Sequence, residues 1–187
     1  MSETRIFLIH GWWSSPHNDW LPWAIKELEG SGYEVIVPSM PDTGHPKIKP
    51  WVDTLSQLVG TPRATDIFIG HSVGTQAILR YLATITSSVD KVILVAPWLT
   101  LTNLGPDEPY EVIESWITTP IDFDKIRSKA KRFTVILSED DPWVPYAATK
   151  DSFAQLLTTN IITFPHHSHF HEDAGHTTFP ELIDREF

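Results

Sequence analysis

The chain has 187 residues, a formal net charge of -10, a pI of about 5.2 and 41% hydrophobic residues. This length suits a single domain over residues 1–187 with a sizeable core, and the acidic balance disfavours a surface that binds nucleic acid or anionic membranes. No cysteine is present, which excludes disulfides, thiolate metal ligands and a cysteine nucleophile.

The hydropathy pattern and the first residues bear on location. No apolar run is as long as a membrane span. The stretch MSETRIFLIHGWW enters strand-like sequence directly, without the basic region, apolar core and small-residue cleavage site of a signal peptide. We therefore expect a cytoplasmic protein that does not insert into a membrane.

The first half of the chain alternates short apolar runs with amphipathic stretches. RIFLIH is a run of this kind, ends at Gly11, and is typical of a buried strand. In chain order the pattern predicts a strand at residues 5–10, a helix capped by Asn18 or Asp19 that extends to about residue 28, a strand at 33–38, a helix at about 50–58, a strand at 66–71 and a helix directly after it.

The second half repeats this alternation. The helix after residue 71 is expected to bury one stripe of apolar side chains, formed by Ala77, Ile78, Leu82 and Ile85. The elements that follow are a strand at residues 91–96, an excursion from 97 to about 132 with one or two helices, a strand at 133–140, a helix from 145 to about 157, a strand at 161–165 and a short helix near 180–185.

Strands therefore alternate with helices throughout, and the third to fifth strands are apolar at nearly every position. This pattern predicts a parallel sheet with helices on both faces, which is a three-layer α/β/α sandwich. Ligands of such sheets bind beyond the carboxyl ends of the strands. The residues that directly follow the strands are therefore the candidates for a functional site.

The sequence GHSVG at residues 70–74 fits G-x-S-x-G and lies where a strand turns into a helix. In a nucleophile elbow the serine takes a strained backbone conformation at a sharp turn, and glycine two positions before and after it relieves crowding. Ser72 would then be an exposed nucleophile, and the N–H of Val73 would point at a developing oxyanion. The alternative is a glycine-rich turn with a buried or capping serine.

A serine nucleophile needs a base and an acid that orients the base, and in this arrangement the acid precedes the histidine in the chain. SEDDPWVP closes the strand at 133–140 and offers Asp140 and Asp141. Asp141 is better placed, because Pro142 fixes the turn after it and the next helix starts soon afterwards. The alternative is an aspartate that only caps that helix.

The base is expected after the last strand, within FPHHSHFHEDAGH. Four of its histidines could in principle chelate zinc or nickel, but the chain has no cysteine and no H-E-x-x-H pattern. We therefore expect no functional metal site and mostly solvated histidines. Position alone does not choose the base among His166, His167, His169, His171 and His176.

Several stretches together resemble one family, the small serine hydrolases related to retinoblastoma-binding protein 9 and bacterial YdeN. The matching stretches are FLIHGWWSSPHNDW, GHSVGTQAILRYL, SEDDPWVP and SHFHEDAG, and they cover nearly the whole chain. The resemblance implies a minimal α/β-hydrolase fold with about six parallel strands in the order 2-1-3-4-5-6 and no large lid domain.

The resemblance also implies which histidine is the base. The family's catalytic histidine is followed directly by phenylalanine, usually as G-H-F, and His169–Phe170 matches with Ser168 in place of the glycine. His176 is the second choice. The acid of the family matches Asp141 by its spacing to the V-P that follows.

HGWW follows the first strand, and its equivalent in these hydrolases supplies a second oxyanion donor just after H-G. The resemblance therefore implies the N–H of Trp12, where Gly11 allows a tight turn. The side chains of Trp12, Trp13, Trp98 and Trp143 either wall an apolar pocket or only pack in the protein.

Together these residues predict a serine hydrolase that cleaves small carboxylic ester-type substrates through Ser72, His169 and Asp141 and an acyl-enzyme, without a metal or an organic cofactor. Thioesters, amides and peptides use the same machinery, so the sequence does not choose among them. The alternative is a hydrolase-fold protein with weak catalysis that acts by binding a protein partner.

Overall fold

The structure of the protein is a computed structural model that describes residues 4–105 and 109–187. Its strands form one six-stranded sheet in the order β2-β1-β3-β4-β5-β6, and all neighbours pair in parallel, which confirms the predicted architecture and strand order. The strands are β1 (Arg5–Ile9), β2 (Glu34–Ile36), β3 (Ile67–His71), β4 (Val89–Val95), β5 (Ala130–Ser138) and β6 (Thr159–Phe164).

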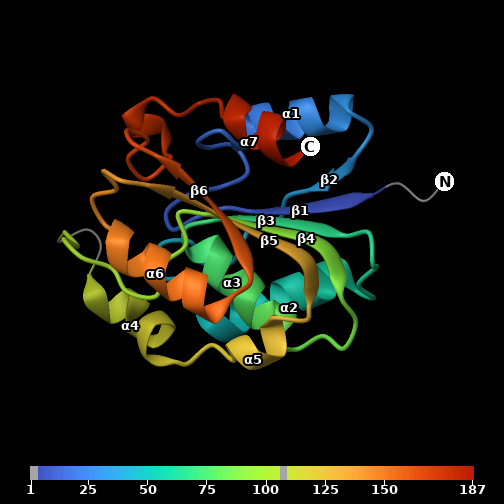
Figure 1. The fold of residues 1–187 in the computed structure, drawn as a ribbon, viewed down its shortest axis with the longest axis horizontal. Helices are drawn as coiled ribbons and strands as arrows, with labels where there is room; N and C mark the ends of the chain where they lie inside the picture. Colours follow the sequence, from blue (N-terminus) through green and yellow to red (C-terminus); the bar gives the residue numbers. More distant parts are fainter. Residues whose placement is uncertain (1–3, 106–108) are drawn as a thin grey trace.

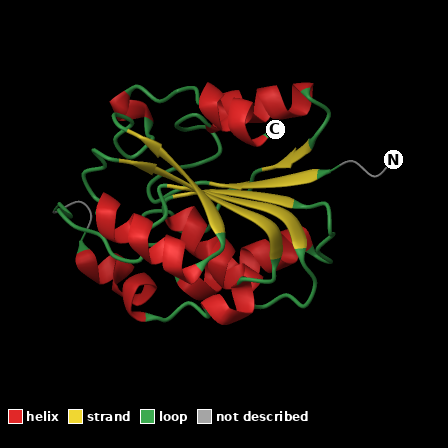
Figure 2. Cartoon of the chain, viewed as in Figure 1, coloured by secondary structure: helices red, strands yellow, loops and turns green. Residues whose placement is uncertain are grey.

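Helices cover both faces of the sheet. Figure 1 shows α1 and α7 together on one face and the remaining α-helices on the other, and Figure 2 shows the sheet as the middle layer. No helix in the described part of the chain is long and apolar enough to cross a membrane. The helices are α1 (Leu21–Gly30), α2 (Ile48–Val59), α3 (Val73–Leu82), α4 (Tyr110–Thr118), α5 (Phe123–Ile126), α6 (Tyr146–Leu156), the 3-10 turn η1 (Glu172–Ala174) and α7 (Pro180–Glu186).

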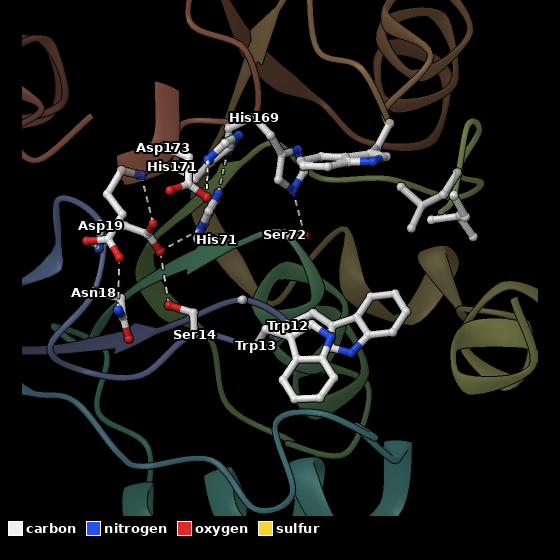
Figure 3. Close-up of a pocket in the computed structure, with 15 residues that line it drawn as sticks. Trp12, Trp13, Ser14, Asn18, Asp19, His71, Ser72, His169, His171 and Asp173 are labelled. Atoms are coloured by element: carbon white, nitrogen blue, oxygen red, sulfur yellow. Dashed lines mark hydrogen bonds and ion pairs between the residues drawn. The ribbon is translucent and has the colours of Figure 1, made fainter. Parts of the chain in front are cut away.

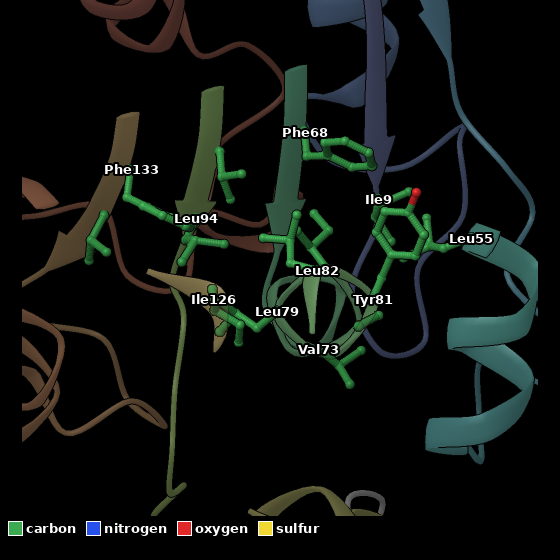
Figure 4. Packing of buried hydrophobic residues seen from close by; sticks show 14 of the residues in the cluster. Ile9, Leu55, Phe68, Val73, Leu79, Tyr81, Leu82, Leu94, Ile126 and Phe133 are labelled. Atoms are coloured by element: carbon green, nitrogen blue, oxygen red, sulfur yellow. The ribbon is translucent and has the colours of Figure 1, made fainter. Parts of the chain in front are cut away.

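The alternation of side chains along each strand divides the core in two. In β1, Phe7 and Ile9 pack in the cluster under α2 and α3, whereas Ile6 and Leu8 pack in the cluster under α1 and α7. Figure 4 shows the first of these clusters between the sheet and α3. Both faces of the inner strands are therefore buried, which explains their nearly continuous apolar sequence.

Helix α3 differs from the predicted helix with one buried stripe, because every residue from Val73 to Leu82 is buried. Several of its polar side chains form hydrogen bonds inside the protein. Arg80 donates to the carbonyl oxygens of Trp116 and Thr119, at the end of α4. The helix therefore lies in the middle of its layer, where the segment between β4 and β5 covers it.

That segment contains two helices, α4 and α5, as the excursion at residues 97–132 predicted. Residues 106–108 of the excursion lie outside the described residues. The helix after β1 differs from its prediction at its start. It begins at Leu21 with Trp20 as N-cap, and no side chain caps it. The prediction that Asn18 or Asp19 caps this helix is wrong, because both side chains take part in contacts with the loop after β6.

Candidate active site

Ser72 lies at a sharp turn between β3 and α3 and has the strained backbone angles φ 51 and ψ -121. Glycine is required on both sides of it. A Cβ on Gly74 would lie 2.4 Å from the carbonyl oxygen of Ile9, and a Cβ on Gly70 would lie 2.9 Å from the backbone nitrogen of Thr75. The close approach of β1, β3 and α3 therefore depends on the two glycines of GHSVG.

A chain of hydrogen bonds runs from Ser72 into the protein. The Nε2 atom of His169 lies 2.9 Å from the hydroxyl of Ser72, and its Nδ1 atom lies 2.7 Å from Oδ2 of Asp141. Because a carboxylate only accepts, Nδ1 carries the proton and Nε2 has a lone pair free for the serine proton. Figure 3 shows Ser72 and His169 at the pocket. This arrangement can transfer a proton from serine to imidazole.

The two oxygens of Asp141 have separate partners. Oδ1 accepts the N–H groups of Trp143 and Val144, each at 3.0 Å, so the turn before α6 holds the carboxylate in place. Oδ2 faces His169, and the side chain is 2% exposed. The Asp141 side chain therefore both caps the turn before α6 and contacts His169.

Asp140 faces the histidine loop in a different way. It accepts from the Ser138 hydroxyl at 2.6 Å and from the N–H groups of His167 and Ser168. These donors, with the Ser138 hydroxyl first, lower the pKa of the Asp140 carboxyl. Asp140 therefore ties the loop after β6 to β5, whereas Asp141 contacts the imidazole of His169.

The loop conformation around His169 accounts for its position. Ser168 and Phe170 both have positive φ, 46 and 56. Such angles are uncommon for residues with a side chain, which explains why glycine is favoured in the place of Ser168. The Phe170 ring is fully buried and lies edge-on to Phe164, so it anchors the loop beneath the histidine.

The remaining histidines of the loop have other surroundings. His166 is 85% exposed. His176 stacks on His167 at 4.8 Å, and burial is the main cause that lowers the pKa of His176. His171 contacts the Trp143 ring and lines the pocket. Within residues 4–105 and 109–187, no group of histidines and carboxylates is arranged to hold a metal ion.

The N–H groups of Trp12 and Val73, which we expect at an oxyanion, are oriented by hydrogen bonds to the carbonyl of the preceding residue in each case. In a trans peptide the C=O and N–H point in opposite directions. The carbonyl of Gly11 accepts from Nδ1 of His10, whose Nε2 accepts from the Met40 N–H, so the Trp12 N–H points away from His10. Burial is the main cause that lowers the pKa of His10, which keeps it neutral in this role.

The second N–H has a similar support. The carbonyl of Ser72 accepts both the N–H and the hydroxyl of Thr75, which turns the Val73 N–H the other way. No hydrogen bond between described residues uses the N–H of Trp12 or Val73. Both donors are therefore available beside Ser72.

A pocket of about 220 Å³ opens over Ser72. Trp12, Trp13 and Trp143 line it, and Trp13 is 60% exposed at its rim. Trp98, the fourth tryptophan considered for this role, is instead buried in the core. The lining residues are Gly11, Trp12, Trp13, Ser14, Asn18, Asp19, His71, Ser72, Leu101, Leu104, Trp143, His169, His171, Glu172 and Asp173.

Two residues of this pocket have roles that the sequence does not reveal. His71 is buried under the site, and its Nε2–H donates to the backbone carbonyl of His169 at 2.8 Å. Burial and the neighbouring His169 lower the pKa of His71 to about 4, so it is neutral at pH 7. Asp19 lies on the other side of it, with Oδ2 4.0 Å from Nδ1 of His71. No sequence pattern pairs residues so far apart.

Solved structures share the fold. The crystal structure of the ydeN gene product of Bacillus subtilis superposes with a TM-score of 0.87 at 31% identity and covers 97% of this chain and 95% of that one. Est1E of Butyrivibrio proteoclasticus, with ferulic acid bound, has a TM-score of 0.73 at 14% identity and covers 96% and 84%. The second likeness concerns the fold alone.

Sequence comparison gives the same family as the resemblance. YdeN of Bacillus subtilis (strain 168), named as a hydrolase, is 32% identical over 96% of this chain and 93% of its own. The serine hydrolase RBBP9 of Rattus norvegicus is 28% identical over 88% of this chain and 82% of its own. The family model named Serine hydrolase matches residues 6–185, and the chain therefore belongs to the serine hydrolase family.

Proposed function

We propose that the protein hydrolyses small carboxylic esters through a Ser72–His169–Asp141 triad and an acyl-enzyme. The observation that carries the proposal is the pair of hydrogen bonds of His169, at 2.9 Å to the Ser72 hydroxyl and 2.7 Å to the Asp141 carboxylate. Both lie in the range expected for a nucleophile, its base and the residue that orients the base.

In the first half of the reaction, Oγ of Ser72 attacks the ester carbonyl carbon while Nε2 of His169 takes the hydroxyl proton. Asp141 holds the proton on Nδ1 and stabilises the imidazolium. The N–H groups of Trp12 and Val73 donate to the oxyanion of the tetrahedral intermediate. When the C–O bond to the leaving alcohol breaks, His169 returns the proton to the departing oxygen.

In the second half, water replaces the alcohol. His169 removes a proton from the water, the hydroxide oxygen bonds to the acyl carbon, and the bond to Ser72 breaks as its oxygen regains the proton. The acid product then leaves. The alcohol leaves with the original serine proton and a water proton replaces it, so Ser72 and His169 regain their starting protonation states and the proposed reaction needs only the ester and water.

The size and lining of the pocket support small substrates. About 220 Å³ is below the usual range for sites that enclose drug-sized ligands. Trp12, Trp143 and Leu104 offer apolar contacts close to Ser72, which suits a short acyl chain. The segment between β4 and β5, whose described residues form the short helices α4 and α5, is too short for a large lid domain, and this supports an open site.

Hydrolysis of 4-nitrophenyl butyrate tests the proposal. Wild-type protein should turn the ester over, and Ser72→Ala should lose at least about 10³-fold in kcat, since the nucleophile is absent. Ser15→Ala is the matched control, because it removes a hydroxyl whose hydrogen bonds among the described residues stay within its own loop. Unchanged turnover in Ser72→Ala contradicts the proposal. Absence of turnover in the wild type, together with partner binding that does not need Ser72, favours the protein-binding alternative.

A further inference from the structure

The proposed reaction uses the part of the pocket next to Trp12 and His169. No step of that reaction uses a polar atom of the opposite part as donor or acceptor to the substrate; the residues of this part are Ser14, Asn18, Asp19, His71 and Glu172. We propose that this part, here called the acceptor subsite, binds a hydrogen-bond donor, an ammonium or a hydroxyl group, that the substrate carries a few bonds from its scissile carbonyl. This inference rests on the proposed hydrolysis and adds the chemical class of the substrate.

The first observation is an acceptor without a donor. Nε2 of His71 carries the proton that it donates to the carbonyl of His169, so in the neutral ring Nδ1 offers a lone pair. The side chain of His71 is 4% exposed and lines the pocket, yet Nδ1 has no hydrogen-bond partner among the described residues. A buried polar atom of this kind is normally satisfied, so its missing donor points to a ligand.

The second observation is a carboxylate beside it. Oδ2 of Asp19 lies 4.0 Å from Nδ1 of His71 and accepts the Ser14 hydroxyl at 3.0 Å. Figure 3 shows Asp19 between Ser14 and His71 at the pocket. Two acceptors separated by 4.0 Å can both bond to one donor atom at ordinary hydrogen-bond distances.

The loop contacts fix this carboxylate in place. Oδ1 of Asp19 accepts the N–H of Glu172 at 3.0 Å, and the carboxylate of Glu172 accepts from the Asn18 amide at 3.1 Å and from the Asp19 N–H at 3.4 Å. These reciprocal bonds join the loop after β1 to the loop after β6. The Asp19 side chain is 8% exposed and already oriented, so a donor that binds there does not have to order it.

The charge of the pocket has one sign. Asp19, Glu172 and Asp173 all line it, and the described lining residues include no lysine or arginine. Among the described residues, the carboxylate of Asp19 therefore accepts hydrogen bonds from neutral donors only. An ammonium group would supply the missing positive charge, whereas a carboxylate in the same place would be repelled.

The distance to Ser72 fits a substituent close to the carbonyl. A Cβ placed on Gly11 would lie 3.3 Å from Cβ of Ser72 and 3.5 Å from Nδ1 of His71. Gly11 therefore places no side chain between the nucleophile and the acceptor subsite. An acyl group bound at Ser72 can therefore extend a short chain over Gly11 to Nδ1 of His71 and Oδ2 of Asp19.

A series of 4-nitrophenyl esters with equal chain length tests this inference. The acyl groups are butyryl, 3-hydroxypropionyl, 3-aminopropionyl and malonyl, which place a methyl, hydroxyl, ammonium or carboxylate group at one end. Each kcat/KM is divided by the rate constant of the same ester with hydroxide, which removes differences in intrinsic reactivity. We expect the hydroxyl or ammonium ester to exceed the butyryl ester by about 10- to 100-fold, and the malonyl ester to be the poorest.

The variant Asp19→Asn assigns the preference to the subsite. It keeps the shape but removes the charge, and because the side-chain oxygen still accepts the Glu172 N–H, an NH2 group takes the place of Oδ2, so the ammonium-to-methyl ratio should fall by about tenfold or more. The matched control is Asp173→Asn, whose side chain is 93% exposed on the same pocket rim, and it should leave that ratio within about twofold. A wild-type ratio near one for both donor esters, with butyrate hydrolysed through Ser72, refutes the subsite and leaves the proposed function standing.

Binding without turnover gives an independent readout if no ester is hydrolysed. In Ser72→Ala protein with 15N-labelled histidine, 3-aminopropionamide should move the Nδ1 resonance of His71 to lower chemical shift, because the lone pair accepts a new hydrogen bond. Butyramide, which has a methyl group in the same place, should leave it unmoved. Equal responses to the two amides, as expected if only a water molecule contacts Nδ1, overturn the inference.

Discussion

Replacement of Asp141 by asparagine isolates what its carboxylate does for His169. The side-chain oxygen of asparagine can keep the two N–H donors of Trp143 and Val144, which leaves the amide NH2 facing Nδ1 of the imidazole. An NH2 group only donates, so Nδ1 must lose its proton and Nε2 must carry it. The lone pair that would accept the proton of Ser72 is then gone.

The magnitude follows from the charges. A carboxylate and an imidazolium about 4 Å apart attract each other by about 4 kcal/mol at an effective dielectric of 20. Loss of that stabilisation alone slows the reaction by about 10³-fold, and the wrong tautomer extends the loss toward about 10⁴-fold. Hydrolysis of 4-nitrophenyl butyrate should therefore fall by about 10³- to 10⁴-fold, with a melting temperature within a few degrees of wild type.

Two controls bracket this result. Glu139→Gln makes the same change of a carboxylate to an amide on an exposed neighbour and should be neutral. The alternative acid, Asp140, binds N–H groups of the loop and not the imidazole, so the kcat of Asp140→Asn should fall by less than about tenfold. A loss below tenfold in Asp141→Asn, or a larger loss in Asp140→Asn, refutes this reasoning.

Three further predictions concern other parts of the site. His169→Ala should lose about 10³-fold or more in kcat on the same ester. The ring of His176 stacks on another histidine of the loop, so the kcat of His176→Ala should stay near that of wild type. The reverse order of the two kcat values would identify His176 as the base. Gly74→Ala places a Cβ 2.4 Å from a carbonyl oxygen of β1 and should lower the free energy of unfolding, measured by urea titration, by about 1–3 kcal/mol. Gly30→Ala, with open space at the end of α1, should be neutral or stabilising. Equal free energies of unfolding for the two variants would contradict the packing described. Burial lowers the pKa of His71 to about 4, so as the pH falls below 6.5 the unfolded chain binds this proton first, and stability should fall between pH 6.5 and 4 by up to about 1.4 kcal/mol per pH unit. His71→Gln should flatten that dependence, and an unchanged slope would show that His71 is not the group responsible.

The sheet was predictable because its strands are buried on both faces. The runs at β1, β3 and β4 are apolar for a physical reason, since helices cover both sides of them, and the order of strands followed from the resemblance. The helix start after β1 was not predictable in the same way. Asn18 and Asp19 are good capping residues by type, but their side chains contact Glu172, far along the chain.

Some residues of the candidate site were also predictable from their neighbours in the sequence, whereas others depend on contacts between distant residues. The elbow at Ser72 depends on neighbouring glycines, so its pattern is visible in five residues. The choice of His169 among five histidines came from the resemblance, because position after β6 does not distinguish them. The hydrogen bond from His71 to the carbonyl of His169 joins residues that are far apart in the sequence and close only in the folded protein, so no local sequence pattern predicts it.

Labelling of the nucleophile tests the central claim most directly. Wild-type protein treated with a fluorophosphonate probe should gain one adduct by intact mass, and peptide mapping should place it on Ser72, since the hydroxyl that bonds to Nε2 of His169 is the activated one. His169→Ala should slow the labelling strongly while the protein remains folded by circular dichroism. An adduct on another serine, or labelling of Ser72 at the same rate without His169, would contradict the account.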